Sequence, residues 1–184
     1  ISKIYVSTDS PLTAEIAKKE GAICPFLRPP ELSEPAVSLE QVQNFSLKKI
    51  EDEIGIPDLV VHLEETFPFR SKNIIDEMII KLIEEGHDTV IAGKEEPGWL
   101  WKLSKNGSFK RIDQGDIPRE FKDSPYIGLH GCCCITYPSV IRGGTLLGKK
   151  TGIYQVNHLL SGFEIRDKKA AKLAFKLLNT NNEF

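Results

Sequence analysis

The segment DLVVHLEETFPFR, residues 58–70, decides the fold that we expect for this chain of 184 residues. Its first part, 59–63, is a short apolar run rich in β-branched residues, which is typical of a strand covered on both faces. The chain then turns polar and enters a helical pattern over 71–85, where apolar residues recur every three or four positions. A strand, a polar turn and a helix make half of a βαβ unit, so the segment predicts an interior strand of an α/β sheet.

The same alternation of strand and helix patterns recurs on both sides of this segment. It predicts an α/β fold with a mostly parallel, Rossmann-like sheet and helices on both faces. We expect a single domain over residues 1–184 that lacks its N-terminal part, because the first strand pattern starts almost at residue 1. The predicted strands lie at 3–8, 22–26, 59–63, 88–92, 126–137 and 152–156, and the main predicted helices at 11–20, 38–53, 71–85 and 167–178. The long strand at 126–137 is expected to be interrupted by Gly128 and Gly131.

The alternation breaks down at Gly98. The sequence there reads WLWKL, then a turn containing Asn-Gly, then FKRI, which is a strong signal for a β-hairpin. A polar loop containing Pro118 follows it. We therefore expect an inserted hairpin and loop subdomain over 98–125, with the two tryptophans as core or subunit-interface anchors.

The composition excludes several classes of partner. The formal net charge is −2, and the basic residues are interleaved with acidic ones, so the chain lacks the basic stripe that nucleic acid requires. No apolar run approaches the roughly 20 residues that cross a bilayer. The four cysteines, Cys24 and 132–134, lack CxxC spacing and are expected to act as small apolar side chains in a reducing compartment. We therefore expect a soluble, cytoplasmic protein without a membrane partner.

Several polar residues are candidates for a site, each with a structural alternative. Glu64, Thr66 and Arg70 follow the strand at 59–63, where ligands bind in open α/β sheets, but turn residues are commonly polar for backbone reasons alone. Arg28 is held between Leu27 and two prolines and suits planar recognition of a base or phosphate; the alternative is a surface ion pair.

The remaining candidates are two acidic residues and a histidine. Glu164 and Asp167 could bind a hard cation through oxygen, whereas Asp167 is also well placed as the N-cap of the last helix. His130, beside Gly131, could face a cleft or be a satisfied core group. His62 and His158 carry no mechanistic argument of their own.

Five segments in order resemble the acylneuraminate cytidylyltransferase family, which activates acidic sugars. They are VSTDS at 6–10, AEIAKKEGA at 14–22, FLRPPELS at 26–33, DLVVHLEETFPFR at 58–70, and GKKTGIYQV at 148–156 with FEIRD at 163–167 behind it. The resemblance implies a fold like that of nucleotide-diphospho-sugar transferases. It also implies transfer of CMP from CTP to an acidic nonulosonic sugar, with Mg²⁺ as cofactor, and a homodimer formed through the hairpin region.

The resemblance also implies roles for single residues. Arg28 and Ser38 match positions that contact the cytosine end of the nucleotide, and the turn residues Glu64, Thr66 and Arg70 are expected to face the sugar, with Glu64 where relatives carry Gln. The family's metal-binding aspartates, spaced by one residue, correspond here to Glu164 and Asp167, which changes both length and spacing. No residue is assigned as a catalytic base or nucleophile.

The family's N-terminal loop, rich in Gly, Ser, Lys and Arg, which wraps the triphosphate, has no counterpart in these residues. We therefore expect that roughly 40 residues, a strand plus a helix of ordinary length, precede this sequence. Two alternatives to the CMP transferase follow from these departures. One is a non-catalytic homologue that keeps the fold for binding or dimer assembly, and the other is a transferase that uses a different nucleoside triphosphate.

Overall fold

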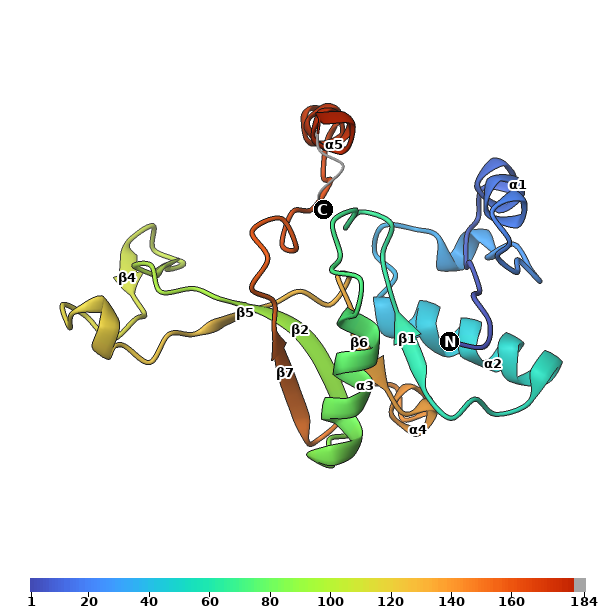
Figure 1. The fold of residues 1–184 in the computed structure, drawn as a ribbon, viewed down its shortest axis with the longest axis horizontal. Coiled ribbons are helices and arrows are strands. Elements are labelled where there is room, and N and C mark those ends of the chain that lie inside the picture. The colour runs from blue at the N-terminus through green and yellow to red at the C-terminus, as the bar shows by residue number, and fades with distance from the viewer. Residues whose placement is uncertain (181–184) are drawn as a thin grey trace. The chain divides into compact units, whose positions relative to one another are not determined.

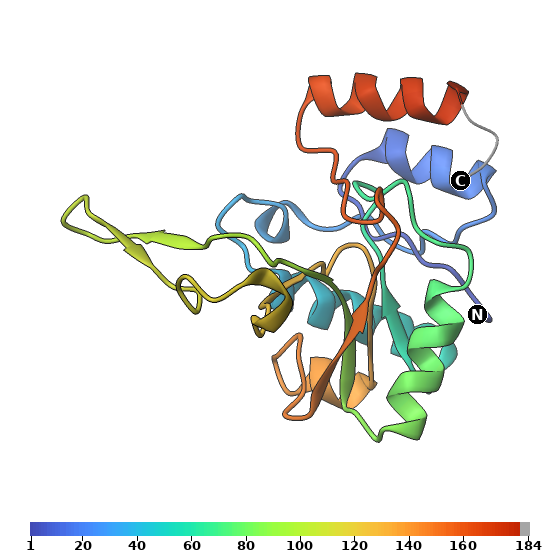
Figure 2. The ribbon, with the colours of Figure 1, turned by 60° about the vertical axis from the view of Figure 1, so that its left-hand side comes forward.

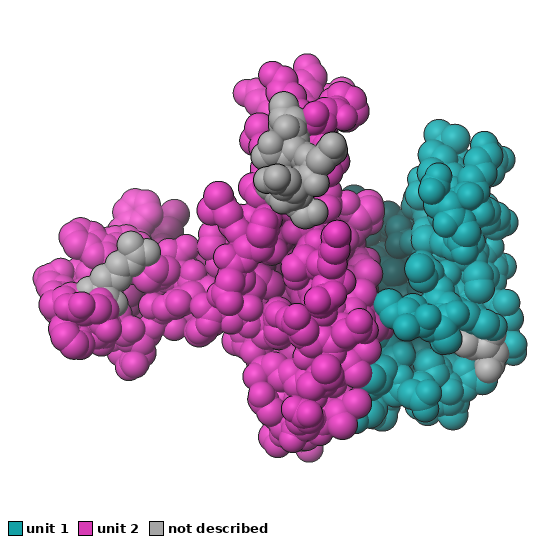
Figure 3. All heavy atoms as spheres, viewed as in Figure 1, with its two compact units in different colours: residues 1–60, 136–148 teal, residues 61–135, 149–184 magenta. Residues whose placement is uncertain are grey.

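The structure is a computed structural model that describes residues 1–180. It contains two compact units, each built from two segments of the chain (Figure 3). Unit 1 comprises residues 1–60 and 136–148, and unit 2 comprises residues 61–135 and those from 149 onward. The single domain over 1–184 and the inserted subdomain over 98–125 stay predictions.

Helices and strands alternate along most of the described chain, as Figure 1 shows. The helices are α1 (Pro11–Lys19), α2 (Leu39–Ile54), α3 (Ile74–Glu84), α4 (Pro138–Arg142) and α5 (Lys168–Thr180), with short 3₁₀ turns at η1 (Pro30–Leu32) and η2 (Arg119–Phe121). The strands are β1 (Val60–His62), β2 (Thr89–Glu95), β3 (Trp101–Leu103), β4 (Phe109–Arg111), β5 (Tyr126–Gly128), β6 (Cys134–Thr136) and β7 (Thr151–Gln155).

Unit 1 is mainly helical. The side chain of Asn44 in α2 donates to the carbonyl of Ile141 in α4 over 2.9 Å, and Phe26 packs edge-to-face on Phe45. The strands predicted at 3–8 and 22–26 are reduced to one parallel bridge between Tyr5 and Ile23, so the prediction of two full strands was wrong. A bridge of this kind leaves the neighbouring residues without the ladder that defines a strand.

The five-stranded sheet has the order β1-β6-β2-β5, and β7 also pairs with β2. β7 runs parallel to β2, with Thr89 opposite Thr151, whereas β5 runs antiparallel to it, with Gly93 opposite Gly128. The mixed α/β fold is therefore confirmed, but a mostly parallel sheet is not. The strand predicted at 126–137, with interruptions at its glycines, forms as β5 and β6 along one edge of β2. The Leu129 amide donates to the Ala92 carbonyl over 2.7 Å, and the Ala92 amide donates to the Cys133 carbonyl over 2.8 Å, so residues 130–132 bulge out between the two strands.

The core of unit 2 forms where α3 packs against β2 and β7. Met78 and Leu82, one helical turn apart, are completely buried, as are Val90 and Ala92 in β2. The four cysteines are free thiols in buried positions, and burial raises the pKa of Cys133 and Cys134 to about 12. Among residues 1–180, no helix is long and apolar enough to cross a membrane.

The predicted hairpin is formed by β3 and β4, which pair antiparallel with Trp101 opposite Arg111. Figure 2 shows it at the end of an extension that continues from β2. Its apolar side chains are exposed, with Trp99 at 67% and Phe109 at 68%. The tryptophans are therefore not core residues of the isolated chain. Their role as subunit-interface anchors stays a prediction.

Candidate functional site

The turn that follows β1 is held in place by Arg70. Its guanidinium donates to the main-chain carbonyls of Cys132, over 2.6 Å, and Gly131, over 2.9 Å, and to that of Glu64. Partial burial lowers the pKa of Arg70, and the Glu64 amide adds a 2.8 Å bond to the Gly131 carbonyl. Arg70 therefore ties the two turns together through carbonyl oxygens, which leaves nearby carboxylates available for other partners.

The Glu64 side chain lies directly over Gly131. A Cβ at that glycine would be 2.5 Å from the carboxyl carbon of Glu64 and 2.8 Å from the ring of Phe67, so the position accepts only glycine without a shift. The Glu64 carboxylate is 3.4 Å from Nε2 of His62, whose ring is stacked at a tilt on that of His130, with centroids 4.6 Å apart. Burial lowers the pKa of His62, which favours a neutral imidazole beside the carboxylate.

The segment before α5 lies against the same turn. The amide of Ile165 donates to the Thr66 carbonyl over 2.8 Å, and Phe163 packs edge-to-face on Phe69. The Thr66 hydroxyl is buried and has no hydrogen-bond partner among the described residues. Thr66 and the residues on either side of Ile165, which include Glu164, are thereby brought together in unit 2.

The two predicted metal ligands each have a protein partner. The guanidinium of Arg166 donates to Oε2 of Glu164 over 2.7 Å. Oδ1 of Asp167 accepts the amides of Lys169 and Ala170 at 2.8 and 2.7 Å, so the N-cap interpretation of Asp167 is confirmed. These contacts engage one oxygen of each carboxylate.

The two predicted nucleotide contacts lie in unit 1. Arg28 donates from Nε to the hydroxyl of Ser33 over 3.1 Å, and its Nη2 is 3.4 Å from the carboxylate of Asp9, so the ion-pair interpretation is confirmed. Ser38 is the N-cap of α2 and forms a capping box with Gln41. Both side chains thus have structural roles, and their contact with a nucleotide stays a prediction.

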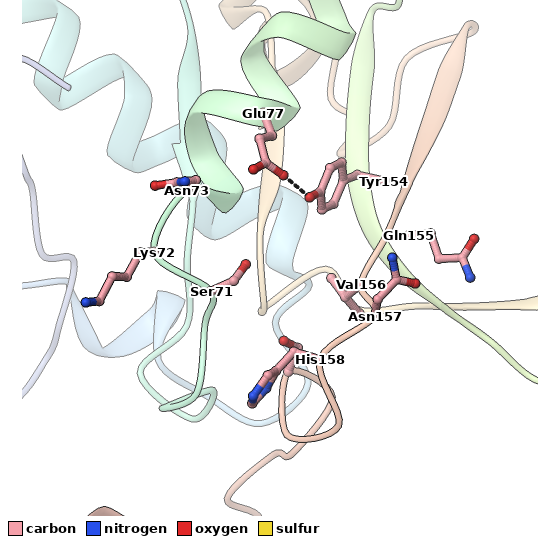
Figure 4. Close-up of a pocket in the computed structure, with 10 residues that line it drawn as sticks. Ser71, Lys72, Asn73, Glu77, Tyr154, Gln155, Val156, Asn157 and His158 are labelled. Carbon is pink, nitrogen blue, oxygen red and sulfur yellow. Dashed lines mark hydrogen bonds between the residues drawn. The ribbon is translucent and has the colours of Figure 1, made fainter. Parts of the chain in front are cut away.

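A polar pocket of about 250 Å³ opens in unit 2 between the start of α3 and the end of β7 (Figure 4). One wall comes from the residues that join the turn after β1 to α3, and the other from the loop after β7. It is lined by Ser71, Lys72, Asn73, Glu77, Tyr154, Gln155, Val156, Asn157, His158 and Ser161.

The pocket combines hydrogen-bond donors with acceptors. Tyr154 donates to Glu77, and this bond raises the pKa of Tyr154 to about 12 (Figure 4). Ser161 is 2% exposed, and its buried hydroxyl has no partner among residues 1–180. Asn73 begins α3 without a side-chain cap, so the first amides of the helix lack that partner. Such a lining suits a small ligand with several hydroxyl groups and a negative charge.

A comparison with models of known protein families shows the family to which this chain belongs. The family model described as cytidylyltransferase matches residues 1–107, more than half of the chain. The chain belongs to the cytidylyltransferase family. No curated protein sequence matches the chain significantly.

Solved structures share the fold of the chain. One is 4-diphosphocytidyl-2C-methyl-D-erythritol synthase from Anaerococcus prevotii, at 12% identity and a TM-score of 0.68, with 97% of this chain and 82% of that chain covered. Another is CMP:2-keto-3-deoxy-manno-octonic acid synthetase in complex with CTP, at 10% identity and a TM-score of 0.65, with 97% and 81% covered. At such low identities the likeness is one of fold.

Sequence reasoning found the turn after β1 but missed most of the residues that line the pocket. Ser161 and Asn73 are ordinary polar residues in loops, and nothing in their spacing marks them as neighbours. A usable signal was present for His62 and Glu64, because residues two apart in an extended segment point to the same side.

Proposed function

We propose that the chain transfers CMP from CTP to an acidic nonulosonic sugar. The anomeric hydroxyl oxygen attacks the α-phosphorus, a new P–O bond forms, the bond to pyrophosphate breaks, and the hydroxyl proton passes to solvent. The observation that carries this proposal is the polar pocket beside the turn after β1, in a chain of the cytidylyltransferase family.

The sugar acid is proposed to bind in this pocket. The Ser161 hydroxyl and the uncapped start of α3 supply donors for a carboxylate or for sugar hydroxyls, and Glu77 supplies an acceptor. Glu64 and Thr66 at the neighbouring turn are proposed to contact further sugar hydroxyls. Arg70 is a positioning residue in this proposal, because its guanidinium is occupied by main-chain carbonyls.

The nucleotide is proposed to contact Arg28 and Ser38 of unit 1 at its cytosine end. The guanidinium of Arg28 is partly exposed, at 22%, and its bonds to Ser33 and Asp9 hold it in one orientation. A planar donor fixed in this way suits in-plane hydrogen bonds to a base. Ser38 offers a hydroxyl next to the start of α2, where partial positive charge favours an electron-rich group.

Magnesium is proposed as the cofactor, held by Glu164 and Asp167. The described contacts use Oε2 of Glu164 and Oδ1 of Asp167, so each carboxylate keeps one oxygen of the type that Mg²⁺ prefers. When bound, the ion would neutralise charge on the triphosphate. Arg166 holds Glu164 in one orientation, and Asp167 is held by the helix that it caps.

The experiment is an assay of pyrophosphate release with CTP, Mg²⁺ and a panel of nonulosonic acids. We expect release with CTP and at least one of these acids, and much less with UTP or ATP. Ser161→Ala should raise the KM for the sugar about tenfold, the equivalent of one lost hydrogen bond, with a smaller change in kcat. Ser139→Ala, at an exposed position in α4, is the control.

Absence of pyrophosphate release with every acid and nucleotide would contradict the proposal. It would favour a non-catalytic homologue, for which the ion pair between Glu164 and Arg166 is the supporting observation. If Ser161→Ala leaves pyrophosphate release and the KM for the sugar unchanged, the proposed activity stands, but the pocket is not the sugar site.

A homodimer formed through the β3–β4 hairpin is also proposed. Its support is the set of exposed apolar side chains there, Trp99, Trp101, Leu103 and Phe109, each more than half exposed. Light scattering at micromolar protein should give twice the mass of the chain, and Trp101→Ser with Phe109→Ser should give the monomer. A monomeric wild-type protein would contradict this proposal.

A further inference from the structure

Three side chains of unit 2 converge where β1 ends and the turn before β6 begins. One coordinating atom from each of His62, Glu64 and His130 lies within 4.8 Å of the other two. Among the residues that the structure describes, this is the one group of three or more such side chains that could enclose an ion. All three are partly buried, so the group is neither a solvated charge run nor sealed from solvent.

The local fold explains the convergence. His62 ends β1 and Glu64 is two residues further along, so both side chains leave the chain on the same side. The bond from the Glu64 amide to the Gly131 carbonyl brings the next turn alongside, and His130 immediately precedes that carbonyl. Gly131 itself leaves the space that the Glu64 carboxylate fills. The group is therefore fixed by backbone pairing as well as by side-chain packing.

Two imidazoles and one carboxylate form a donor set with a definite chemical preference. Nitrogen ligands of this kind suit zinc and other first-row transition metals, whereas magnesium and calcium prefer oxygen alone. Tetrahedral ligands about 2 Å from zinc are about 3.4 Å apart. The three ligand atoms lie within 4.8 Å of one another, so side-chain rotations that bring them closer by at most about 1.4 Å would reach this spacing. The fourth position would remain open to water.

We propose that His62, Glu64 and His130 bind a divalent transition-metal ion of the zinc class. The site is separate from Glu164 and Asp167 in its residues and in its ligand chemistry. It does not depend on the proposed transfer of CMP. A bound ion would join the end of β1 to the turn before β6, alongside the bonds from Arg70.

Charged side chains near His62 have opposite effects on the binding of a cation. Glu65 and Glu64 add negative charge near His62, and Arg70 adds positive charge. The Arg70 guanidinium is engaged with the carbonyls of residues 64, 131 and 132, so it does not occupy the Glu64 carboxylate. The Glu64 side chain is 36% exposed, so solvent reaches the group.

The test uses the untagged full chain, freed of metal by a chelator, and Co²⁺ as a spectroscopic probe for zinc. We expect saturable visible d–d absorption at one Co²⁺ per chain, without a thiolate charge-transfer band, and displacement by Zn²⁺ but not by excess Mg²⁺. In nuclear magnetic resonance spectra, the ring protons of His62 and His130 should shift strongly on Co²⁺ binding. This measurement needs no variant.

Variants then identify the ligands. His130→Ala and Glu64→Gln should each weaken Co²⁺ binding by more than about 100-fold, because loss of a direct ligand exceeds the effect of an outer partner. His87→Ala is the matched control, since His87 also lies beside a glutamate, 2.9 Å from Glu85, but outside the group of three. Circular dichroism would confirm that each variant is folded.

Several outcomes would overturn the proposal. They are the absence of saturable absorption in the wild-type protein, ring-proton shifts at other histidines only, and Co²⁺ binding that His87→Ala abolishes while His130→Ala keeps it. A strong thiolate band would assign the metal to the cysteines instead.

Discussion

Two arginines in unit 2 organise loops in opposite ways. Arg70 donates to the main-chain carbonyls of residues 64, 131 and 132, whereas Arg111 is bound to the carboxylates of Asp113 and Asp116 and to the carbonyl of Gly115. Lys122 adds a 3.0 Å bond to Asp113, and the Arg111 guanidinium also lies over the ring of Trp99.

The difference lies in what each arginine leaves available. In the loop after β4, positive and negative side chains satisfy one another, which gives a closed structural network. In the turn after β1, the guanidinium binds only backbone, so Glu64 and Thr66 keep polar groups for other partners. The two arginines therefore leave different polar groups available, and the following variants test this difference.

The largest effect is expected for Arg70→Met. It leaves the carbonyls of residues 64, 131 and 132 without their charged donor, so the free energy of unfolding should fall by about 3 kcal/mol. Urea denaturation measures it. Arg166→Met, at a side chain that is 79% exposed, should change stability by less than about 0.5 kcal/mol. Equal losses of unfolding free energy in the two variants would contradict the structural role assigned to Arg70.

Gly131→Ala should have the next largest effect. The new Cβ would meet the Glu64 carboxyl group and the Phe67 ring, so we expect a loss of about 2 kcal/mol from overpacking and displacement of Glu64. Thermal unfolding and Co²⁺ titration measure the two consequences. Gly162→Ala is the control, because its Cβ would have nothing closer than 3.6 Å. A Gly131→Ala protein as stable as the control, with Co²⁺ affinity unchanged, would show that the carboxylate is not held there.

The smallest effect is expected on the stability of the hairpin region when the pH is lowered. The bond from Arg111 is the main cause that lowers the pKa of Asp113 from 3.8 to about 2. Because the folded-state pKa is lowered, the stabilisation is present above about pH 4 and is lost as the pH falls towards 2. Both tryptophans of the chain, Trp99 and Trp101, lie in the hairpin region beside this network. Their fluorescence should therefore report the loss of the stabilisation as the pH falls.

Matched variants isolate the contribution of Asp113. Asp113→Asn should abolish this acid transition of the hairpin, whereas Asp116→Asn, at a carboxylate that is 87% exposed, should largely keep it. A transition that is the same in both variants would mean that the network does not depend on its buried member.

Sequence reasoning predicted the α/β fold because apolar periodicity reports burial directly. The strand at β1, the helix α3 and the Asn-Gly hairpin were all found in this way. The interruption between β5 and β6 was expected from the glycines, but the bulge of residues 130–132 was not, because buried glycine and cysteine have the same apolar composition as a strand.

The site was predicted less well than the fold, for a physical reason. Glu64 and Arg70 follow a strand, and that position alone made them candidates. Ser161 becomes recognisable only through its burial in the pocket. His130 was a candidate from its place beside Gly131, but its proximity to His62 and Glu64 depends on pairing across distant segments. Arg70 donates to main-chain carbonyls, and a sequence cannot indicate such partners because every residue has a carbonyl.

The measurement that tests the account most directly is a titration of ¹⁵N-labelled protein with CTP, Mg²⁺ and a nonulosonic acid, followed by amide chemical shifts. We predict that the sugar acid shifts the amides of residues 64–73, 131 and 154–161, and leaves those of residues 113–122 in place. Shifts confined to residues 113–122, or no shifts in unit 2, would contradict the claim that the turn after β1 and its pocket form the site.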